Sequence, residues 1–307
     1  MNTRMNFHQC HMDRLESITT STNSKDMNTL LHYLKQTGKE LRFLCYTEKG
    51  SPLIRNKEGI YSEEEMNECQ MNLMCYMGTT EQYHYIAVTT KIQPQNSIEM
   101  HLRTCMIELE KELCDMLGYG SCLIKFNISA TYCFRCGTKM TYGDYGHCMN
   151  CPNCKNQVFP RTDPVIIVLI KHPTEKKCLF VRKPIMPVNR YTCIAGFLEV
   201  GESGESCVIR EAFEEAHLRV KNVKYVISSA YPMAMTNQLM LGYEAESIDT
   251  EIDIVPGNEL CEAFWATEDE VKYALEQSNK YEFSGKYTVP ECYIAHQLFK
   301  HWISTLN

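Results

Sequence analysis

The stretch of sequence that decides the fold is residues 196–218, "GFLEVGESGESCVIREAFEEAHL". Six of its twenty-three residues are glutamate, and Glu211, Glu214 and Glu215 recur at i, i+3 and i+4. This spacing places like charges on one face of a helix, where they repel one another. The face is therefore either solvated or bound to something strongly positive. We favour the second, because a glycine and a further glutamate precede the trio at a motif-like spacing.

The sequence around this trio predicts a helix that begins after Ser203, a suitable N-cap, and runs to about Ala216. We expect its carboxylates to project outward while its apolar residues face the core: Cys207, Val208, Ala212 and Phe213. Clustered carboxylates bind hard divalent cations, and Mg²⁺ or Mn²⁺ fits best. Such ions bridge a pyrophosphate and activate water. Arg210 is expected to hold Glu211 by a bidentate contact.

Composition and charge exclude several classes of protein. A net charge of −7 over 307 residues argues against general nucleic-acid affinity, so a phosphate substrate needs a bound cation or local basic residues. The sequence shows neither a secretory h-region nor an apolar run long enough to span a membrane. Its seventeen cysteines are odd in number, which favours free thiols in a reducing compartment over a disulfide framework. We therefore expect a cytoplasmic protein.

Two C-x2-C pairs predict a structural zinc ribbon, because each knuckle presents two thiolates to a tetrahedral metal. The pairs are formed by Cys133, Cys136, Cys151 and Cys154. Gly137 suits a knuckle turn with positive φ. Cys148 offers an overlapping choice for the second knuckle, and we treat it and His147 as spares. The alternative is that these are ordinary buried cysteines.

The remaining sequence predicts four parts: a flexible terminus at 1–26, a small α+β domain at 27–128, the ribbon at 129–160 and a third domain at 161–307. The apolar run that follows the ribbon reads as a buried strand. Residues 99–117 have helical periodicity. Thr267 is a candidate N-cap with Glu270 three residues on, and a closing helix has Pro290 at or near its first turn.

The stretch 196–218 resembles the Nudix box, G-x5-E-x7-R-E-U-x-E-E-x-G-U. The matching residues are Gly196, Glu202, Arg210, Glu211, Ala212, Glu214, Glu215 and Leu218. The match departs at His217, where the family has glycine. This position ends the helix, and we expect a left-handed conformation that histidine tolerates better than most residues.

The upstream zinc ribbon, the joint "FPRTDPVIIVLI" and the tail "VPECYIAHQLFKHWI" are similar to the NADH pyrophosphatase family. The resemblance implies an α+β protein whose Nudix domain is an α/β/α sandwich. It also implies a homodimer that uses Mg²⁺ or Mn²⁺ to hydrolyse NADH or NAD⁺ to AMP and nicotinamide mononucleotide. Some family members also remove NAD caps from RNA.

The resemblance also assigns roles to individual residues. It implies that Arg210, Glu211 and Glu215 are catalytic and that the metal ligands are Glu211, Glu214, Glu215 and Glu259. Phe197 and Phe159 correspond to aromatic residues that sandwich adenine across the dimer. Glu262 matches a second glutamate near Glu259, and it and Tyr231 are further candidate substrate-binding residues. Tyr231 stands in for tryptophan in the motif S-Q-P-W-P-F-P, of which little else survives here. Either Glu211 or Glu215 is the candidate base.

Other functions remain open at this point. The altered motif favours a Nudix hydrolase of another nucleoside diphosphate derivative, such as ADP-ribose or a dinucleoside polyphosphate. A binding or scaffold protein that has lost catalysis is a second alternative, against which the intact carboxylate trio argues. RNA binding through the ribbon is a third, which the acidic net charge disfavours.

Overall fold

The computed structural model describes residues 27–232, 237–254, 259–278 and 285–306. Contacts divide the chain into two compact units. The first unit contains 163–231 and the described part of 238–307, and the second contains the described part of 7–162. The predicted flexible terminus at 1–26 lies outside the described residues. The predicted domain boundaries stay predictions.

The first unit is built around one mixed sheet whose strand order is β14-β15-β10-β11-β16, with β13 also paired to β10. Its strands are β10 (Thr162–Lys171), β11 (Lys177–Arg182), β13 (Ile194–Phe197), β14 (Val220–Tyr231), β15 (Asn237–Ser247) and β16 (Glu262–Thr267). A parallel pair of short strands accompanies it, β12 (Arg190–Tyr191) and β17 (Tyr287–Thr288). The central strand β10 is nearly continuous in apolar residues, as expected for a strand that is covered on both faces.

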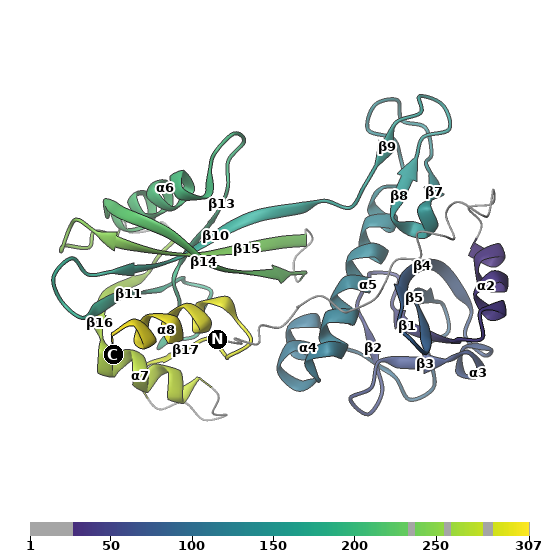
Figure 1. The fold of residues 1–307 in the computed structure, drawn as a ribbon, viewed down its shortest axis with the longest axis horizontal. Coiled ribbons are helices and arrows are strands. Elements are labelled where there is room, and N and C mark those ends of the chain that lie inside the picture. The colour runs from purple at the N-terminus through teal and green to yellow at the C-terminus, as the bar shows by residue number, and fades with distance from the viewer. Residues whose placement is uncertain (1–26, 233–236, 255–258, 279–284, 307) are drawn as a thin grey trace. The chain divides into compact units, whose positions relative to one another are not determined.

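Helices cover both faces of this sheet (Figure 1). They are α6 (Gly204–Ala216), α7 (Glu268–Gln277) and α8 (Ile294–Thr305). Side chains alternate between the faces of a strand, so Ile166 and Val168 join the core beneath α6. Ile167 and Leu169 join the core with α7 and α8. The predicted α+β fold with an α/β/α sandwich is confirmed.

The ends of two helices test the predictions made from local sequence. Glu270 N–H donates to Thr267 Oγ1 at 3.3 Å and the Glu270 carboxylate accepts from Thr267 N–H at 2.9 Å, so the predicted capping box is confirmed. Pro290, predicted at or near the first turn of the last helix, lies shortly before this helix and not within it. Tyr293 N–H donates to Pro290 O at 3.0 Å in a separate turn, and α8 begins only at Ile294.

The second unit contains a sheet of order β3-β1-β5-β4. Its strands are β1 (Glu40–Tyr46), β3 (Ile60–Ser62), β4 (Met71–Thr79) and β5 (Tyr83–Thr90), with β2 (Leu53–Ile54) and β6 (Ile98–Glu99) paired beside it. Its helices are α2 (Met27–Gln36), α3 (Glu63–Met66), α4 (Leu102–Glu108) and α5 (Lys111–Ser129). Leu30 of α2 packs in one core with Phe43 and Ile86, whereas Tyr46 donates its hydroxyl to Leu117 O of α5 at 3.0 Å.

The helical periodicity of residues 99–117 does not produce one helix. Leu109 has φ −107° and ψ 160°, and Glu110 also has an extended backbone, so α4 ends and α5 begins on either side of them. The buried thiol of Cys114 then lies 2.9 Å from Cys105 O. The periodicity predicted helical structure in this stretch but not the break at Leu109 and Glu110.

The cysteine-rich segment forms a small antiparallel sheet that is attached to the rest of the second unit. Its strands are β7 (Thr141–Gly143), β8 (Cys148–Asn150) and β9 (Gln157–Val158). Asn127 of α5 donates to Gly146 O at 2.7 Å, and His147 Nε2 lies 2.7 Å from Tyr76 O of β4. His147 is therefore a structural tether between the ribbon and the neighbouring sheet.

Candidate active site and metal centres

Helix α6 begins and ends where its sequence predicts. Ser203 Oγ accepts a hydrogen bond from Ser206 N–H at 3.2 Å and caps the first turn. His217 has φ 52° and ψ 28°, the left-handed conformation expected at the position where the Nudix box has glycine. Leu218 N–H then donates to Ala212 O at 3.2 Å, which satisfies a carbonyl at the helix end. The departure at His217 therefore leaves the helix intact.

The carboxylates of α6 do not all point outward as predicted. Glu211 and Glu215 retain only 8% and 3% of their exposure, whereas Phe213 is 50% exposed. At about 100° per residue, a helix that turns Glu211, Ala212 and Glu215 toward the sheet must turn Phe213 away. The prediction that Phe213 faces the core was wrong for this reason.

Gly196 makes room for one of these buried carboxylates. It lies in β13, opposite Ile166 of β10, and the Glu211 carboxylate lies directly against it. A Cβ added at Gly196 would lie 2.0 Å from the Glu211 carboxyl carbon. No real Cβ atom approaches another group so closely, so this position requires glycine for as long as Glu211 occupies its site.

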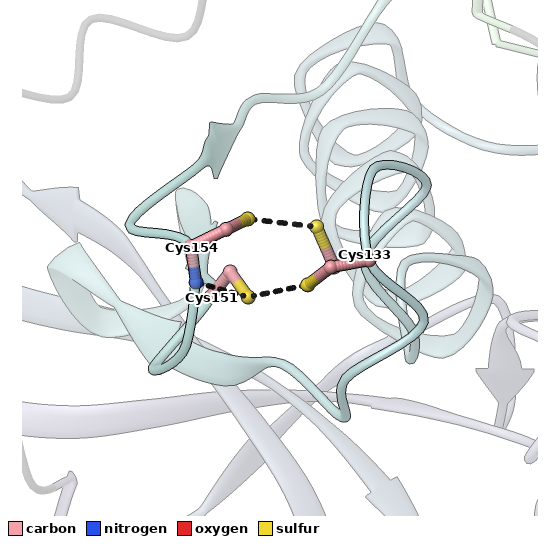
Figure 2. A group of neighbouring side chains, drawn as sticks. Cys133, Cys151 and Cys154 are labelled. Carbon is pink, nitrogen blue, oxygen red and sulfur yellow. Dashed lines mark hydrogen bonds between the residues drawn. The ribbon is translucent and has the colours of Figure 1, made fainter.

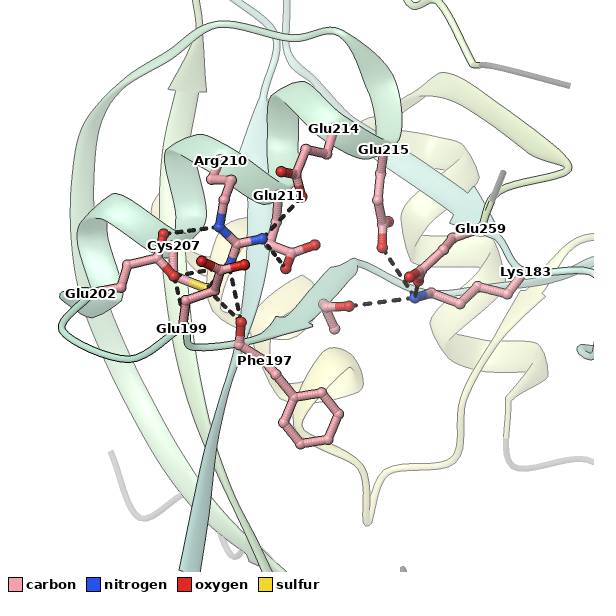
Figure 3. Close-up of polar contacts among 11 residues, drawn as sticks. Lys183, Phe197, Glu199, Glu202, Cys207, Arg210, Glu211, Glu214, Glu215 and Glu259 are labelled. Atoms are coloured by element: carbon pink, nitrogen blue, oxygen red, sulfur yellow. Dashed lines mark hydrogen bonds and ion pairs between the residues drawn. The ribbon is translucent and has the colours of Figure 1, made fainter. Parts of the chain in front are cut away.

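Arg210 ties the glutamates of the box together (Figure 3). Its Nε and Nη2 reach the two Glu202 oxygens at 2.9 and 2.8 Å, which makes Glu202 the bidentate partner. Glu211 receives a single bond from Nη1 at 2.7 Å, and Glu214 receives another at 2.9 Å. Hydrogen bonds from Arg210 lower the pKa of Glu202 to about 2. The predicted contact between Arg210 and Glu211 thus exists, but the bidentate fork serves Glu202.

A lysine that the sequence analysis missed lies at the other end of the site. Lys183 follows β11, and its Nζ donates to Glu215 Oε1 at 3.0 Å and also contacts Glu259. Figure 3 shows the side chains of Glu215 and Glu259 directed at this one ammonium. Burial raises the pKa of Glu215 to about 7, although Lys183 opposes the rise. No local pattern in the sequence marks Lys183, because its partners lie 32 and 76 residues away.

Glu262 has different partners from Glu259. It lies opposite Arg182 across β11 and β16, and Arg182 donates to its Oε1 from Nε at 3.0 Å. Tyr191 donates its hydroxyl to Oε2 at 2.7 Å. These two donors lower the pKa of Glu262, with Arg182 the larger cause. Both oxygens of this candidate substrate-binding residue therefore already accept hydrogen bonds from neighbouring strands.

The three aromatic candidates lie in different surroundings. Phe197 ends β13 with its ring 53% exposed, beside the Arg210 and Glu211 contacts. Tyr231 ends β14 with its ring centroid 6.3 Å from that of Tyr293. Residues 233–236, which follow it in the altered motif, lie outside the described residues. Phe159 is 57% exposed and belongs to the second compact unit.

The carboxylates of the first unit fit a divalent cation by the chemistry of their donors. Glu215 Oε2 is buried and has no hydrogen-bond partner among the residues that the structure describes, so this oxygen is available to bind a cation. The three other glutamates already pair with cationic side chains. Arg210 contacts one oxygen each of Glu211 and Glu214, and Lys183 contacts one oxygen of Glu259. Hard divalent cations prefer such oxygen ligands. Glu211, Glu214, Glu215 and Glu259 are therefore the residues that could hold Mg²⁺ or Mn²⁺.

The four ribbon cysteines predicted from the spacing lie together. Figure 2 labels three of them, Cys133, Cys151 and Cys154. The ligand atoms of Cys133, Cys136, Cys151 and Cys154 all lie within 4.8 Å of one another. The Sγ atoms of Cys133 and Cys154 are 3.6 Å apart, and those of Cys136 and Cys151 are 3.5 Å apart. A tetrahedral zinc with Zn–S bonds of about 2.3 Å needs sulfurs about 3.8 Å apart, so this group fits zinc.

The knuckle turns support the same choice of cysteines. Gly137 has the predicted positive φ, 70°, and Lys155 has φ 60° at the matching position of the second knuckle. Cys148 lies outside the group, and its sulfur accepts from Gln157 Nε2 at 3.3 Å. None of the sixteen cysteines in the described part of the chain is joined in a disulfide.

The part of the chain that carries these carboxylates also matches a known protein family. The family model described as "NUDIX domain" matches residues 160–287. The chain therefore contains a NUDIX domain, and the resemblance of residues 196–218 to the Nudix box is confirmed. In the described part of the chain, no helix is long and apolar enough to cross a membrane.

The chain is also similar in sequence to individual proteins. The chain is 34% identical over 206 residues to "NAD-capped RNA hydrolase NUDT12" of Homo sapiens, an alignment that covers 64% of this chain and 43% of that protein. It is 36% identical over 168 residues to "NAD-capped RNA hydrolase NudC" of Pseudomonas aeruginosa strain LESB58, which covers 55% of this chain and 59% of that protein. The chain thus spans less than two thirds of the length of either relative.

The solved structures to which the chain is similar include a NUDIX hydrolase from Nitrosomonas europaea. The TM-score is 0.37 at 21% identity, and the match covers 52% of this chain and 96% of that chain. A NUDIX family hydrolase from Clostridium perfringens gives a TM-score of 0.36 at 17% identity, covering 47% of this chain and 98% of that chain.

Proposed function

We propose that the chain is a metal-dependent pyrophosphatase that hydrolyses NADH or NAD⁺ to AMP and nicotinamide mononucleotide, and that it also removes NAD caps from RNA. The observation that carries the proposal is the buried Glu215, one of whose oxygens has no partner, beside Glu211 and the Arg210 contacts. The substrate class is proposed from the two relatives, both of which are named as NAD-capped RNA hydrolases.

Each residue of the site has a role in the proposed reaction. Bound Mg²⁺ or Mn²⁺ would supply charge neutralisation at the pyrophosphate and a lowered pKa for a bound water. Glu211, Glu214, Glu215 and Glu259 hold the metal. Arg210 keeps Glu211 in position against Gly196, and Glu211 or Glu215 accepts the proton of the attacking water.

The exposed ring of Phe197 offers a surface on which adenine stacks, which binds a purine without reading its edges. We propose that Phe159 of a second copy completes the sandwich and that the protein is a homodimer. Light scattering of the purified protein tests the dimer. The zinc ribbon is proposed as a structural part, because four protein thiolates leave no open position on the metal. We also propose that the protein is cytoplasmic, which the odd number of seventeen cysteines in the sequence supports.

A substrate panel tests the proposed function. NADH, NAD⁺, ADP-ribose and diadenosine polyphosphates are incubated side by side with Mg²⁺ or Mn²⁺, and the products are resolved; NAD-capped RNA is a further arm. The proposal requires NADH or NAD⁺ to lead and AMP to appear. If ADP-ribose or a dinucleoside polyphosphate leads, the altered sequence after Ser228 has changed the specificity. Absence of any turnover would favour the scaffold alternative.

A further inference from the structure

Lys183 occupies the position at which two proposed metal ligands meet. Its Nζ lies 3.0 Å from Glu215 Oε1 and 3.4 Å from Ala195 O, and it also contacts Glu259 Oε2. Glu215 comes from α6, whereas Glu259 comes from the segment before β16. The lysine side chain is 27% exposed, so its ammonium borders solvent on one side.

We propose that Lys183 is a built-in counter-ion of the Glu215 and Glu259 carboxylates and that it competes with the divalent cation for them, which sets the metal affinity. This inference rests on the proposed function, because it takes these two glutamates as metal ligands. An ammonium and a divalent cation that contact the same carboxylates repel each other strongly at such distances. Lys183 must therefore withdraw when the metal binds.

The two cations of the site differ in how readily they can leave. Arg210 distributes its donors over three carboxylates and Phe197 O, an arrangement that its planar fork fixes. Lys183 carries one compact charge on a flexible four-carbon stem beside solvent. Arg210 is therefore suited to hold its carboxylates permanently. Lys183 is suited to neutralise Glu215 and Glu259 until a metal displaces it.

Calorimetric titration of Mn²⁺ into the substrate-free protein tests the inference. Lys183→Gln removes the competing charge, and we expect its dissociation constant for Mn²⁺ to fall about tenfold. Lys171→Gln is the matched control, because Lys171 also pairs with two glutamates, Glu244 and Glu246, and is 24% exposed. The control should bind Mn²⁺ as the wild type does. An unchanged or higher dissociation constant in Lys183→Gln would overturn the inference.

A second variant covers the case in which Lys183→Gln does not fold. Lys183→Arg keeps the charge and adds a fork that can hold both carboxylates, so it should bind Mn²⁺ more weakly than the wild type. Equal or tighter binding by this variant, or absence of Mn²⁺ binding by the wild type, would overturn the inference. Because no substrate is present, the result is independent of the reaction: tighter Mn²⁺ binding without NADH hydrolysis would refute only the proposed function.

Discussion

The Glu211 carboxylate lies so close over Gly196 that a Cβ at that glycine would be 2.0 Å from the carboxyl carbon. We therefore predict that Gly196→Ala displaces Glu211 from its place between β13 and Arg210. Turnover of the best substrate should fall roughly a hundredfold, since small misplacements of catalytic groups are costly. Thermal unfolding should show a loss of about 1 to 3 kcal/mol, the usual cost of overpacking.

A double variant identifies the cause of that loss. In the Glu211→Ala background the colliding group is absent, so adding Gly196→Ala should cost little further stability. The two substitutions are then strongly non-additive. If their effects on the free energy of unfolding simply add, the contact between Gly196 and Glu211 does not explain the requirement for glycine.

Phe197 supplies a prediction about binding. Phe197→Ala should raise the KM for NADH by roughly 10- to 100-fold, because stacking of a base on an aromatic ring contributes about 1–3 kcal/mol. Stability should change little, since the ring is already 53% exposed. Phe213→Ala is the control, as this ring on α6 is 50% exposed. Steady-state kinetics would refute the role of Phe197 if both variants showed the same KM as the wild type.

The ribbon predicts a sharp difference between two cysteine substitutions. Cys136→Ser should lose the zinc and loosen the ribbon, because the group of four sulfurs no longer supplies four thiolates. Cys148→Ser should keep one zinc per chain, since Cys148 lies outside that group and bonds to Gln157 instead. The zinc content of both variants, measured by mass spectrometry, tests these two predictions. Zinc loss in Cys148→Ser would assign the second knuckle differently, and zinc retained in Cys136→Ser would contradict the group of four ligands.

The lowered pKa of His84 predicts how the stability of the second unit depends on pH. Burial, with a smaller contribution from Lys39, lowers the pKa of His84 to about 4. An unfolded histidine has a pKa of about 6.5, so between these values only the unfolded chain binds the proton. The stabilisation is complete above pH 6.5 and is lost as the pH falls toward 4. The loss should be of the order of 1–3 kcal/mol.

Unfolding of the wild type and of His84→Asn between pH 7 and pH 4.5 measures this effect. The variant should show the weaker pH dependence, whatever its absolute stability. His32→Asn serves as the control, because His32 is exposed and its ring pairs with Gln36. An imidazole of His84 that titrates near pH 6.5 in NMR spectra would contradict the prediction.

What the sequence predicts well is decided by residues close together in the chain. Ser203 as N-cap, the Thr267–Glu270 capping box and the positive φ of Gly137 each depend on neighbours within a few positions. The α/β/α sandwich followed from the resemblance to the Nudix family, whereas the apolar run of β10 by itself predicted only a buried strand. The spacing of the two C-x2-C pairs likewise predicted that the four ribbon cysteines lie together.

The features that could not be predicted join residues far apart in sequence. Lys183 meets Glu215 and Glu259 only because β11, α6 and the segment before β16 converge. Arg182 and Glu262 are opposite each other across two strands, although 80 residues separate them. Periodicity within one helix also could not show which face would be buried, since α6 buries two glutamates and exposes Phe213.

The central claim is that the α6 carboxylates carry a metal-dependent hydrolysis. The most direct test measures AMP release from the best substrate of the panel by the wild type, Glu215→Gln and Glu205→Gln, each with and without Mg²⁺. Glu205 is an exposed glutamate of the same helix and serves as the control. We predict Mg²⁺-dependent release by the wild type and the control, and a loss of roughly 10²- to 10⁴-fold in a folded Glu215→Gln. Release at the wild-type rate by Glu215→Gln would contradict the account.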